Sequence, residues 1–233
     1  MISVIVIDYN GGKVTQDCID SICASTYTDY ELIVIDNYVT KQFYAEGLNE
    51  GIGKAKGDII ICCSNDIIVH KDWLTHIATF MQDKEIGIAN PMVLDIKCAL
   101  PFSAVSKLAF GWFPYSSIEY YYDYIYFGST ANRIRRIRIK GKPDYANGCC
   151  MIIRREVLNK VGSFDEKFKI FYDDVDMSLR IRKAGYKVAV VEKAVIWHKG
   201  GDTIRKRSLF LNKKRHIHDI IRFMYKRIKG EYK

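Results

Sequence analysis

Apolar residues in the first ninety positions of this chain fall into short uninterrupted runs, separated by longer stretches of mixed character. The runs are rich in Ile and Val and predict buried strands, at 2–8, 31–36, 58–63 and 86–90. The intervening stretches predict helices, at 14–24, 40–56 and 73–82. Strands without polar alternation, joined by helices, predict an α/β fold with a mostly parallel sheet flanked by helices.

The carboxyl ends of the first three predicted strands are polar. Their sequences are Asp8-Tyr9-Asn10, Asp36-Asn37 and Ser64-Asn65-Asp66. In sheets of this type, ligands bind in the crevice beyond the carboxyl ends of the strands. The topology alone therefore predicts a binding site here.

The regular alternation stops between residues 95 and 142. This segment is rich in Tyr, Phe and Trp and ends in the basic run RIRRIRIKGK at 133–142. Aromatic rings beside cations suit contact with sugar rings, bases or a membrane interface. An extra packed layer or a dimer contact is the slightly favoured alternative. Residues 145–158 then predict a further buried strand that leads into a helix.

Three carboxylates, Asp173, Asp174 and Asp176, begin a predicted helix that ends at Gly185. A short β-run follows at 187–191, and His198 precedes a Gly-Gly pair. Carboxylates crowded beside apolar residues have raised pKa values, which prepares a general base or a metal site. Capping of the helix N-terminus explains one or two of the three.

The net charge of +9 lies entirely in the C-terminal tail, where residues 199–233 hold 12 Lys/Arg against 3 Asp/Glu. Apolar residues between 209 and 228 recur mostly at helical spacing among Lys and Arg, which predicts an interfacial helix for an anionic membrane. The competing interpretation is that this helix packs back on the domain or on a second subunit. We therefore divide the chain into a main domain, 1–201, and a basic amphipathic tail, 202–233.

The seven cysteines include no CxxC pair, and two Cys-Cys doublets lie inside apolar runs. This usage predicts buried, reduced thiols and a cytosolic protein. The first strand follows Met1 without a signal-peptide pattern, and no apolar run has transmembrane length. With the basic tail, these features predict a cytoplasmic protein associated peripherally with the membrane.

Six segments in register carry a resemblance to a known family. They are SVIVIDYNGG, ELIVIDN, GLNEGIGKAKGDIIICCSND, NGCCMIIRREVLNKVGSFDEKF, FYDDVDMSLRIRKAGYKV and WHKGG. From Ile2 to about Gly201 the chain resembles the family 2 glycosyltransferases with the GT-A fold, most closely their rhamnosyltransferase-like branch.

The resemblance implies a role for each matching residue. The donor nucleotide sugar would be bound by Tyr9, Asp36, Asn37, Asn49, Ser64 and Asn65. A divalent metal, Mn²⁺ or Mg²⁺, would be held by Asp66 and His198. Gly148 would border the acceptor, and Asp176 would orient it. Asp174, assisted by Asp173, would be the general base.

The implied reaction is an inverting, metal-assisted transfer of a sugar from a nucleotide-diphosphate sugar to a hydroxyl of a saccharide or lipid-linked acceptor. One departure is that Ser64 stands where the family's metal-binding motif begins with Asp, which leaves a catalytically weak relative as an alternative. A nucleotidyltransferase would need a Gly-rich, Lys/Arg-bearing loop after the first strand, and only Gly11-Gly12-Lys13 is present. A nucleic-acid-binding protein is the remaining alternative, but the acidic triplet would repel phosphates, so no nucleic acid is expected. A homodimer is compatible with the sequence.

Overall fold

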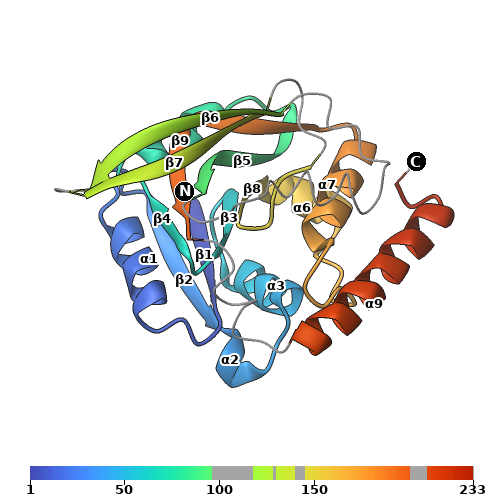
Figure 1. The fold of residues 1–233 in the computed structure, drawn as a ribbon. Coiled ribbons are helices and arrows are strands. Elements are labelled where there is room, and N and C mark those ends of the chain that lie inside the picture. Colours follow the sequence, from blue (N-terminus) through green and yellow to red (C-terminus); the bar gives the residue numbers. More distant parts are fainter. Residues whose placement is uncertain (96–117, 128–129, 140–144, 200–208, 233) are drawn as a thin grey trace.

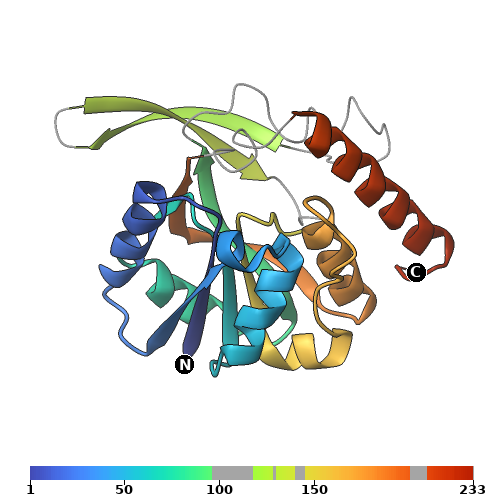
Figure 2. The same cartoon turned by 90° about the horizontal axis from the view of Figure 1, so that it is seen from below.

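The computed structural model describes residues 1–95, 118–127, 130–139, 145–199 and 209–232. It has a mixed α/β fold in which one curled sheet is flanked by helices (Figures 1 and 2). Its strands are β1 (Ile2–Asp8), β2 (Tyr30–Asp36), β3 (Ile59–Ser64), β4 (Ile67–Val69), β5 (Ile86–Asp95), β6 (Ile118–Phe127), β7 (Thr130–Ile139), β8 (Cys150–Arg154) and β9 (Lys187–His198). Its helices are α1 (Lys13–Cys23), α2 (Asn37–Thr40), α3 (Tyr44–Lys54), α4 (Trp73–Phe80), α6 (Arg155–Val161), α7 (Asp173–Lys183) and α9 (Leu209–Ile228).

The sheet has the strand order β2-β1-β3-β8-β5-β7-β6. The first three strands are parallel, as predicted, because β1 pairs in parallel with both β2 and β3. The sheet as a whole is more mixed than the apolar runs predicted, since β8 is antiparallel to both β3 and β5. The first residue of β8, Cys150, pairs with Cys63 near the end of β3, so β8 has to run back in the opposite direction.

The core lies on both faces of the sheet, because successive residues of β1 point to opposite sides. Val4 and Val6 face a cluster that includes residues of α1 and α4. Ile5 and Ile7 face a second cluster, with residues of α3, α6 and α7. All four side chains are nearly or fully buried. Two-sided burial explains why these strands have no polar alternation in the sequence.

Several elements differ from the predicted pattern, among them β5, which continues through Pro91 to Asp95, beyond the predicted 86–90. The predicted helix 40–56 is divided into α2 and α3, because Lys41 adopts a left-handed conformation (φ 61°) and α3 starts after Phe43. Strand β9 continues to His198, beyond the predicted 187–191, and pairs with the short β4, which the sequence did not indicate.

The segment that broke the alternation contains the β6–β7 hairpin, which crosses over the other strands in Figure 1. The hairpin joins the sheet through β7, which pairs with the end of β5. The aromatic residues from Phe102 to Tyr115 lie outside the described residues, whereas those from Tyr120 to Phe127 belong to β6. Five of the cysteines are buried, as predicted, namely Cys18, Cys62, Cys63, Cys149 and Cys150; Cys23 is exposed, and Cys98 lies outside the described part of the chain.

The C-terminal tail forms the predicted helix, and α9 packs back on the domain beside α7 (Figure 1). Phe223 is buried with Phe168 and Val175, and Asp219 and Lys226 are buried on the same side of the helix. Within the described ranges, no helix is both long and apolar enough to span a bilayer.

Candidate active site

The polar strand ends lie side by side at one edge of the sheet. Asp8 and Asp36 are register partners at the ends of β1 and β2, and Ser64 ends β3 next to Ile7. The predicted convergence of these ends is therefore present in the fold. Tyr9 follows β1, and its ring meets that of Tyr38 edge-on with centroids 5.7 Å apart.

Asp8 organises the turn after β1, a role that the sequence did not reveal. One of its carboxylate oxygens accepts hydrogen bonds from the Gly11 N–H (3.0 Å), the Thr15 hydroxyl (2.6 Å) and the Asn65 amide (2.7 Å). The turn is tight: a Cβ on Gly11 would lie 2.2 Å from both the Asn65 amide nitrogen and the Thr15 hydroxyl oxygen. Asp8 thus ties the first turn to the segment after β3.

Asp66 and His198 meet at the same edge, where β4 pairs with β9 and Ile67 is the register partner of His198. The Asp66 Oδ1 lies 3.2 Å from His198 Nε2 and accepts a 2.6 Å hydrogen bond from the Ser64 hydroxyl. Burial of Asp66 opposes its charged form, yet the hydrogen bonds from His198 and Ser64 outweigh it and lower its pKa. Asp66 is therefore an anion at neutral pH.

These donors fit a hard divalent cation. A carboxylate, an imidazole nitrogen and a hydroxyl are ligands that Mn²⁺ accepts, and Mg²⁺ favours the oxygen donors. The described residues hold no cluster of three or more His, Cys, Asp or Glu side chains that could bind a metal by themselves. A cation between Asp66 and His198 would thus need further oxygen ligands from water or from a bound phosphate.

The acidic pair starts α7, directly after Tyr172 in a left-handed conformation (φ 68°). Asp174 is partly exposed and accepts hydrogen bonds from the N–H groups of Gly148 (2.9 Å) and Val175 (2.8 Å). Asp173 is 6% exposed, and its Oδ2 has no hydrogen-bond partner among the residues that the structure describes. Asp174 is the member of the pair that a substrate can reach.

Burial raises the pKa of both carboxyl groups. The pKa of Asp173 is raised by two effects, because the negative charge of Asp174 adds to the effect of burial. The two N–H groups bound to Asp174 favour its charged form and limit its shift. The raised pKa of Asp174 is the property that the sequence predicted for a general base.

The turn at Gly148 and Cys149 connects the two halves of the site. The Ser64 N–H donates to the Cys149 carbonyl at 3.0 Å, and the Ser64 hydroxyl oxygen lies 3.4 Å from the same carbonyl. On the other side, Gly148 donates its N–H to Asp174 and accepts a 2.8 Å hydrogen bond from the Tyr44 hydroxyl. The Asp66–His198 pair and Asp174 therefore flank one short turn.

The side chain of Asn90, on β5, holds this turn in place. Its amide nitrogen donates to the carbonyls of Asn147 (3.0 Å) and Cys150 (2.6 Å), and its oxygen accepts from the Asn147 N–H (2.6 Å). Asn90 had no signal in the sequence beyond its place at the end of a predicted strand.

Four residues predicted to bind substrate form hydrogen bonds or ion pairs within the fold. Asn37 is 2% exposed and donates to the Phe43 carbonyl, and Asn65 is 3% exposed and bonded to Asp8 and Thr15. The Asn49 amide pairs with both the N–H and the carbonyl of Phe164.

Asp176 has no exposed surface and is bonded to Arg180, Lys226 and the Tyr232 hydroxyl. Asn37, Asn65 and Asp176 are thus buried and bonded within the framework of the site, whereas Asn49 is partly exposed. Their predicted contacts with substrate stay predictions.

Comparison with known proteins identifies the family of this chain. The family model "Glycosyltransferase like family 2" matches residues 37–218, and "Glycosyl transferase family 2" matches residues 3–46. The chain belongs to glycosyltransferase family 2. An N-acetylglucosaminyl-diphospho-decaprenol L-rhamnosyltransferase of Mycobacterium tuberculosis is 35% identical over 79 residues, which are 33% of this chain and 26% of that protein. That relative is consistent with the rhamnosyltransferase-like branch.

Other relatives match over more of the chain at lower identity. An O-antigen biosynthesis protein of Myxococcus xanthus is 22% identical over 84% of this chain and 17% of its own length. An uncharacterised Sinorhizobium fredii protein is 21% identical over 90% of this chain and 26% of its own. The chain thus spans about a quarter or less of these curated relatives.

Solved structures identify the fold as GT-A. A Pyrobaculum calidifontis mannosyltransferase in complex with GDP-Man and Mn²⁺ superimposes with a TM-score of 0.63 at 17% identity, over 98% of this chain and 64% of that one. GalNAc-T7 with UDP, GalNAc and Mn²⁺ gives 0.61 at 16% identity, over 85% and 44%. The predicted fold class is confirmed.

Proposed function

We propose that this chain transfers a sugar from a nucleotide-diphosphate sugar to a hydroxyl group of a saccharide or lipid-linked acceptor, with inversion at the anomeric carbon. The observation that carries the proposal is the turn at Gly148 and Cys149. The ion pair of Asp66 and His198 lies on one side of this turn, and Asp174, whose pKa is raised, lies on the other. Relatives that bind nucleotide sugars support the substrate class.

The donor half comprises Tyr9, Asp36, Ser64, Asp66 and His198. Tyr9 and Asp36 follow neighbouring strands and would contact the base and ribose, since the Tyr9 ring offers an apolar face and Asp36 an exposed hydrogen-bond acceptor. Asp66 and His198 would hold Mn²⁺ or Mg²⁺, which neutralises charge on the diphosphate leaving group. Mn²⁺ in two of the structural relatives supports this assignment.

The acceptor half centres on Asp174 as general base. An acceptor hydroxyl has a pKa far above neutral, so a positioned carboxylate has to take its proton as the hydroxyl attacks. Each carboxylate oxygen of Asp174 accepts one backbone N–H and keeps a second lone pair for that proton. One base and one displacement invert the anomeric centre, and no nucleophilic carboxylate is required.

The test is a binding and turnover screen. Thermal shift against UDP-, GDP- and dTDP-sugars, with and without Mn²⁺, should show stabilisation by one nucleotide class, because a ligand of the native state raises its apparent stability. The stabilising donor should then be hydrolysed slowly in Mn²⁺. Stabilisation without hydrolysis or transfer would indicate a binding relative, and no stabilisation by any donor would contradict the proposal.

The outward side of α9 supports a peripheral membrane location. Ile217, Ile221, Met224 and Ile228 form an outward stripe at helical spacing, and they are 58%, 64%, 45% and 80% exposed. This stripe lies opposite the side that carries buried Asp219, Phe223 and Lys226. Exposed apolar residues on one side of a helix are typical of an interfacial helix.

The charge of the tail supports an anionic lipid surface as the partner of this stripe. Lys214, Arg227 and Lys229 are exposed near the outward stripe, in the tail that carries all of the net charge. Each cation near an anionic bilayer contributes about 1 kcal/mol of binding free energy. A lipid-linked acceptor would then meet the site at the membrane surface, and the protein would be peripheral to the cytoplasmic leaflet.

Liposome sedimentation of the full chain tests the outward stripe. We expect binding to anionic vesicles, none to neutral vesicles, and loss of binding in Ile221→Ser/Ile228→Ser. Val39→Ser is the matched control, because Val39 is 70% exposed on α2, away from the stripe. Equal binding by both variants would contradict the assignment. Loss of self-association in the double variant, with no vesicle binding by the unaltered chain, would identify the stripe as a dimer contact.

A further inference from the structure

One carboxylate of α9 fastens the loop that leads into the proposed base. Asp219 has no exposed surface and accepts the backbone N–H groups of Lys169, Ile170 and Phe171 at 2.9, 2.9 and 3.0 Å. Consecutive N–H groups that converge on one anion form a nest with strong, directional hydrogen bonds. The loop therefore takes its conformation from a residue about fifty positions later in the chain.

The side chain of the next residue, Tyr172, packs against the same helix, α9. Its backbone is left-handed (φ 68°), a conformation that non-glycine residues keep only where the surroundings impose it. Its ring stacks on Phe223 at 5.2 Å and on His216 at 5.9 Å, and both belong to α9. Because Asp173 follows Tyr172 directly, this backbone geometry sets the start of α7.

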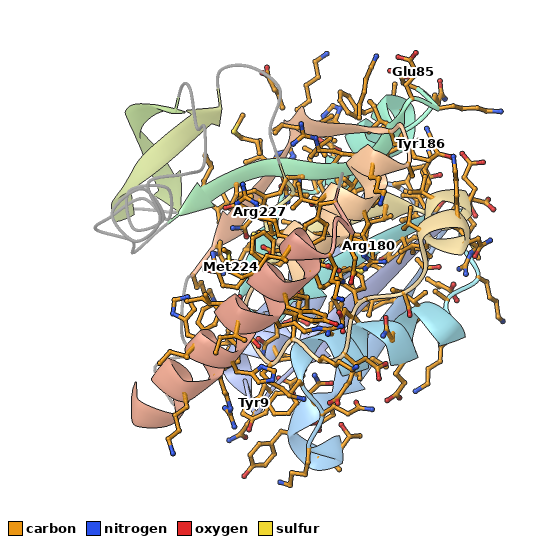
Figure 3. All side chains as sticks on the ribbon, turned by 90° about the vertical axis from the view of Figure 1, so that its right-hand side faces the viewer. Tyr9, Glu85, Arg180, Tyr186, Met224 and Arg227 are labelled. Atoms are coloured by element: carbon orange, nitrogen blue, oxygen red, sulfur yellow. The ribbon has the colours of Figure 1, made fainter. Side chains whose placement is uncertain are left out.

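Further contacts of α9 lie on either side of the loop. Before it, Asp165 accepts hydrogen bonds from Arg222 and Lys226. After it, Lys226 also forms an ion pair with Asp176, one turn into α7. Figure 3 looks onto α9 lying in front of the domain, with Arg180 of α7 labelled beside its C-terminal end. The helix thus holds the loop before, at and after the residue that leads into the acidic pair.

We propose that Asp219 is a positioning residue for the reaction, which fixes the 169–172 loop and thereby the placement of the Asp174 carboxylate. The catalytic consequence rests on the proposed function, whereas the effect on the position of Asp174 does not. The tail helix then has two roles, because its buried side orders the active site while its outward stripe faces a membrane.

The charge of Asp219 supports this role. Around Asp173 lie Asp174 on its own helix, Asp219 from α9, Tyr44 from α3 and Cys62 from β3. Burial and the charge of Asp174 raise the pKa of Asp173 most, and the charge of Asp219 raises it further. Removal of the Asp219 charge should therefore move the acid limb of the pH–rate profile to lower pH, through the coupled acidic pair.

The experiment compares Asp219→Asn with Asp20→Asn in the full chain. Asp219→Asn keeps the shape of the side chain but removes its charge and one acceptor. Asp20→Asn makes the same chemical change on the exposed side of α1. Amide hydrogen exchange by NMR should become faster in Asp219→Asn at 169–171 and also at Gly148 and Val175, the two N–H groups that bind Asp174. With the donor found by the nucleotide-sugar screen and Mn²⁺, kcat should fall roughly 10–10²-fold while the donor KM stays within about twofold.

Faster exchange confined to 169–171, with unchanged exchange at Gly148 and Val175, would overturn the proposal and leave Asp219 a structural residue only. If the unaltered chain turns over no nucleotide sugar, the proposed function fails, and exchange at Gly148 and Val175 still decides the positioning role. If Asp219→Asn does not fold, Phe223→Leu replaces it, because this change removes the ring stack on Tyr172 and keeps the carboxylate. The same exchange pattern is then expected, and its absence is again contrary to the proposal.

Discussion

Asp66 and the Asp173–Asp174 pair are acidic groups in one site, and their environments shift their pKa values in opposite directions. All three are substantially buried, which disfavours the charged form. Asp66 receives hydrogen bonds from Ser64 and His198 that outweigh burial, and its pKa falls. Asp173 lacks a partner at one oxygen and lies beside another carboxylate, and its pKa rises.

This difference separates two chemical tasks. An anion that stays charged suits a divalent cation and the diphosphate that it neutralises. A carboxylate whose pKa is raised suits proton transfer. Burial is common to both halves, so the hydrogen-bond partners decide which task each carboxylate can perform.

The largest expected effect comes from Asp174→Asn. The amide cannot accept the acceptor's proton as a base, so turnover should fall by roughly 10²–10⁴-fold. Donor affinity should stay close to that of the unaltered chain, because Asp174 lies on the acceptor side of the Gly148 turn. Transfer assays and calorimetry with the nucleotide diphosphate measure the two quantities. Near-normal turnover would remove Asp174 as the base, and Asp173→Asn would then be measured in the same way.

Asp66→Ala should act on donor binding instead. Loss of a charged ligand should weaken Mn²⁺-dependent nucleotide binding by more than the 10–100-fold typical of outer-shell partners, roughly 10²-fold or more. Ser64→Asp should preserve or strengthen this binding, since it adds a carboxylate beside Asp66. Calorimetry of the nucleotide diphosphate with Mn²⁺ measures both. An unchanged affinity in Asp66→Ala would exclude a metal role for this residue.

His198→Ala should give a smaller loss, on the order of 10-fold in Mn²⁺ affinity, with the melting temperature in the absence of metal nearly unchanged. His198 is 25% exposed at its side chain, so its removal leaves little unfilled space. Loss of its hydrogen bond should also raise the pKa of Asp66, in the direction already seen for Asp173 and Asp174. A lower melting temperature with normal Mn²⁺ affinity would identify His198 as a structural residue.

Patterns within short segments were sufficient for much of the fold. Continuous Ile/Val runs located the buried strands, and the polar residues that follow them located the edge where β1, β2 and β3 end. Strand direction was harder to predict, because a run such as CCMIIR reads the same whether β8 is parallel or antiparallel to its neighbours. The break between α2 and α3 depends on one left-handed residue, Lys41, which the helical pattern does not reveal.

Charge patterns in the sequence indicated candidate site residues, whereas hydrogen-bond partners from distant segments could not be predicted. The acidic pair was visible in the sequence as adjacent carboxylates at the start of a predicted helix. The burial of Asn65 and Asn37 could not be predicted, because an amide at a strand end suits a ligand and a buried framework bond equally well. Asp219 was missed because its partners at 169–171 lie about fifty residues away, and the α9 pattern was interpreted from its apolar residues.

The smallest expected effect is on stability, and it tests the opposite pKa shifts directly. The pKa of Asp173 is raised above 3.8, so its contribution to stability is present below that pH and is lost as pH rises through the folded-state value. Asp173→Asn cannot ionise and should melt above the unaltered chain at neutral pH, with the gap closing toward pH 4.

The pKa of Asp66 is lowered below 3.8, so its contribution is present above that pH and is lost as pH falls through the folded-state value. Asp66→Asn should therefore melt below the unaltered chain at neutral pH, and the deficit should shrink on acidification below pH 4. For a chain of this length each kcal/mol corresponds to roughly 2–4 °C. Calorimetry in metal-free buffer from about pH 2 to pH 8 therefore covers both trends, because the Asp66 contribution is lost only below pH 4. Asp20→Asn controls for the loss of one surface charge. Changes in melting temperature of the same sign in Asp66→Asn and Asp173→Asn at neutral pH would contradict the opposite pKa shifts of the two residues.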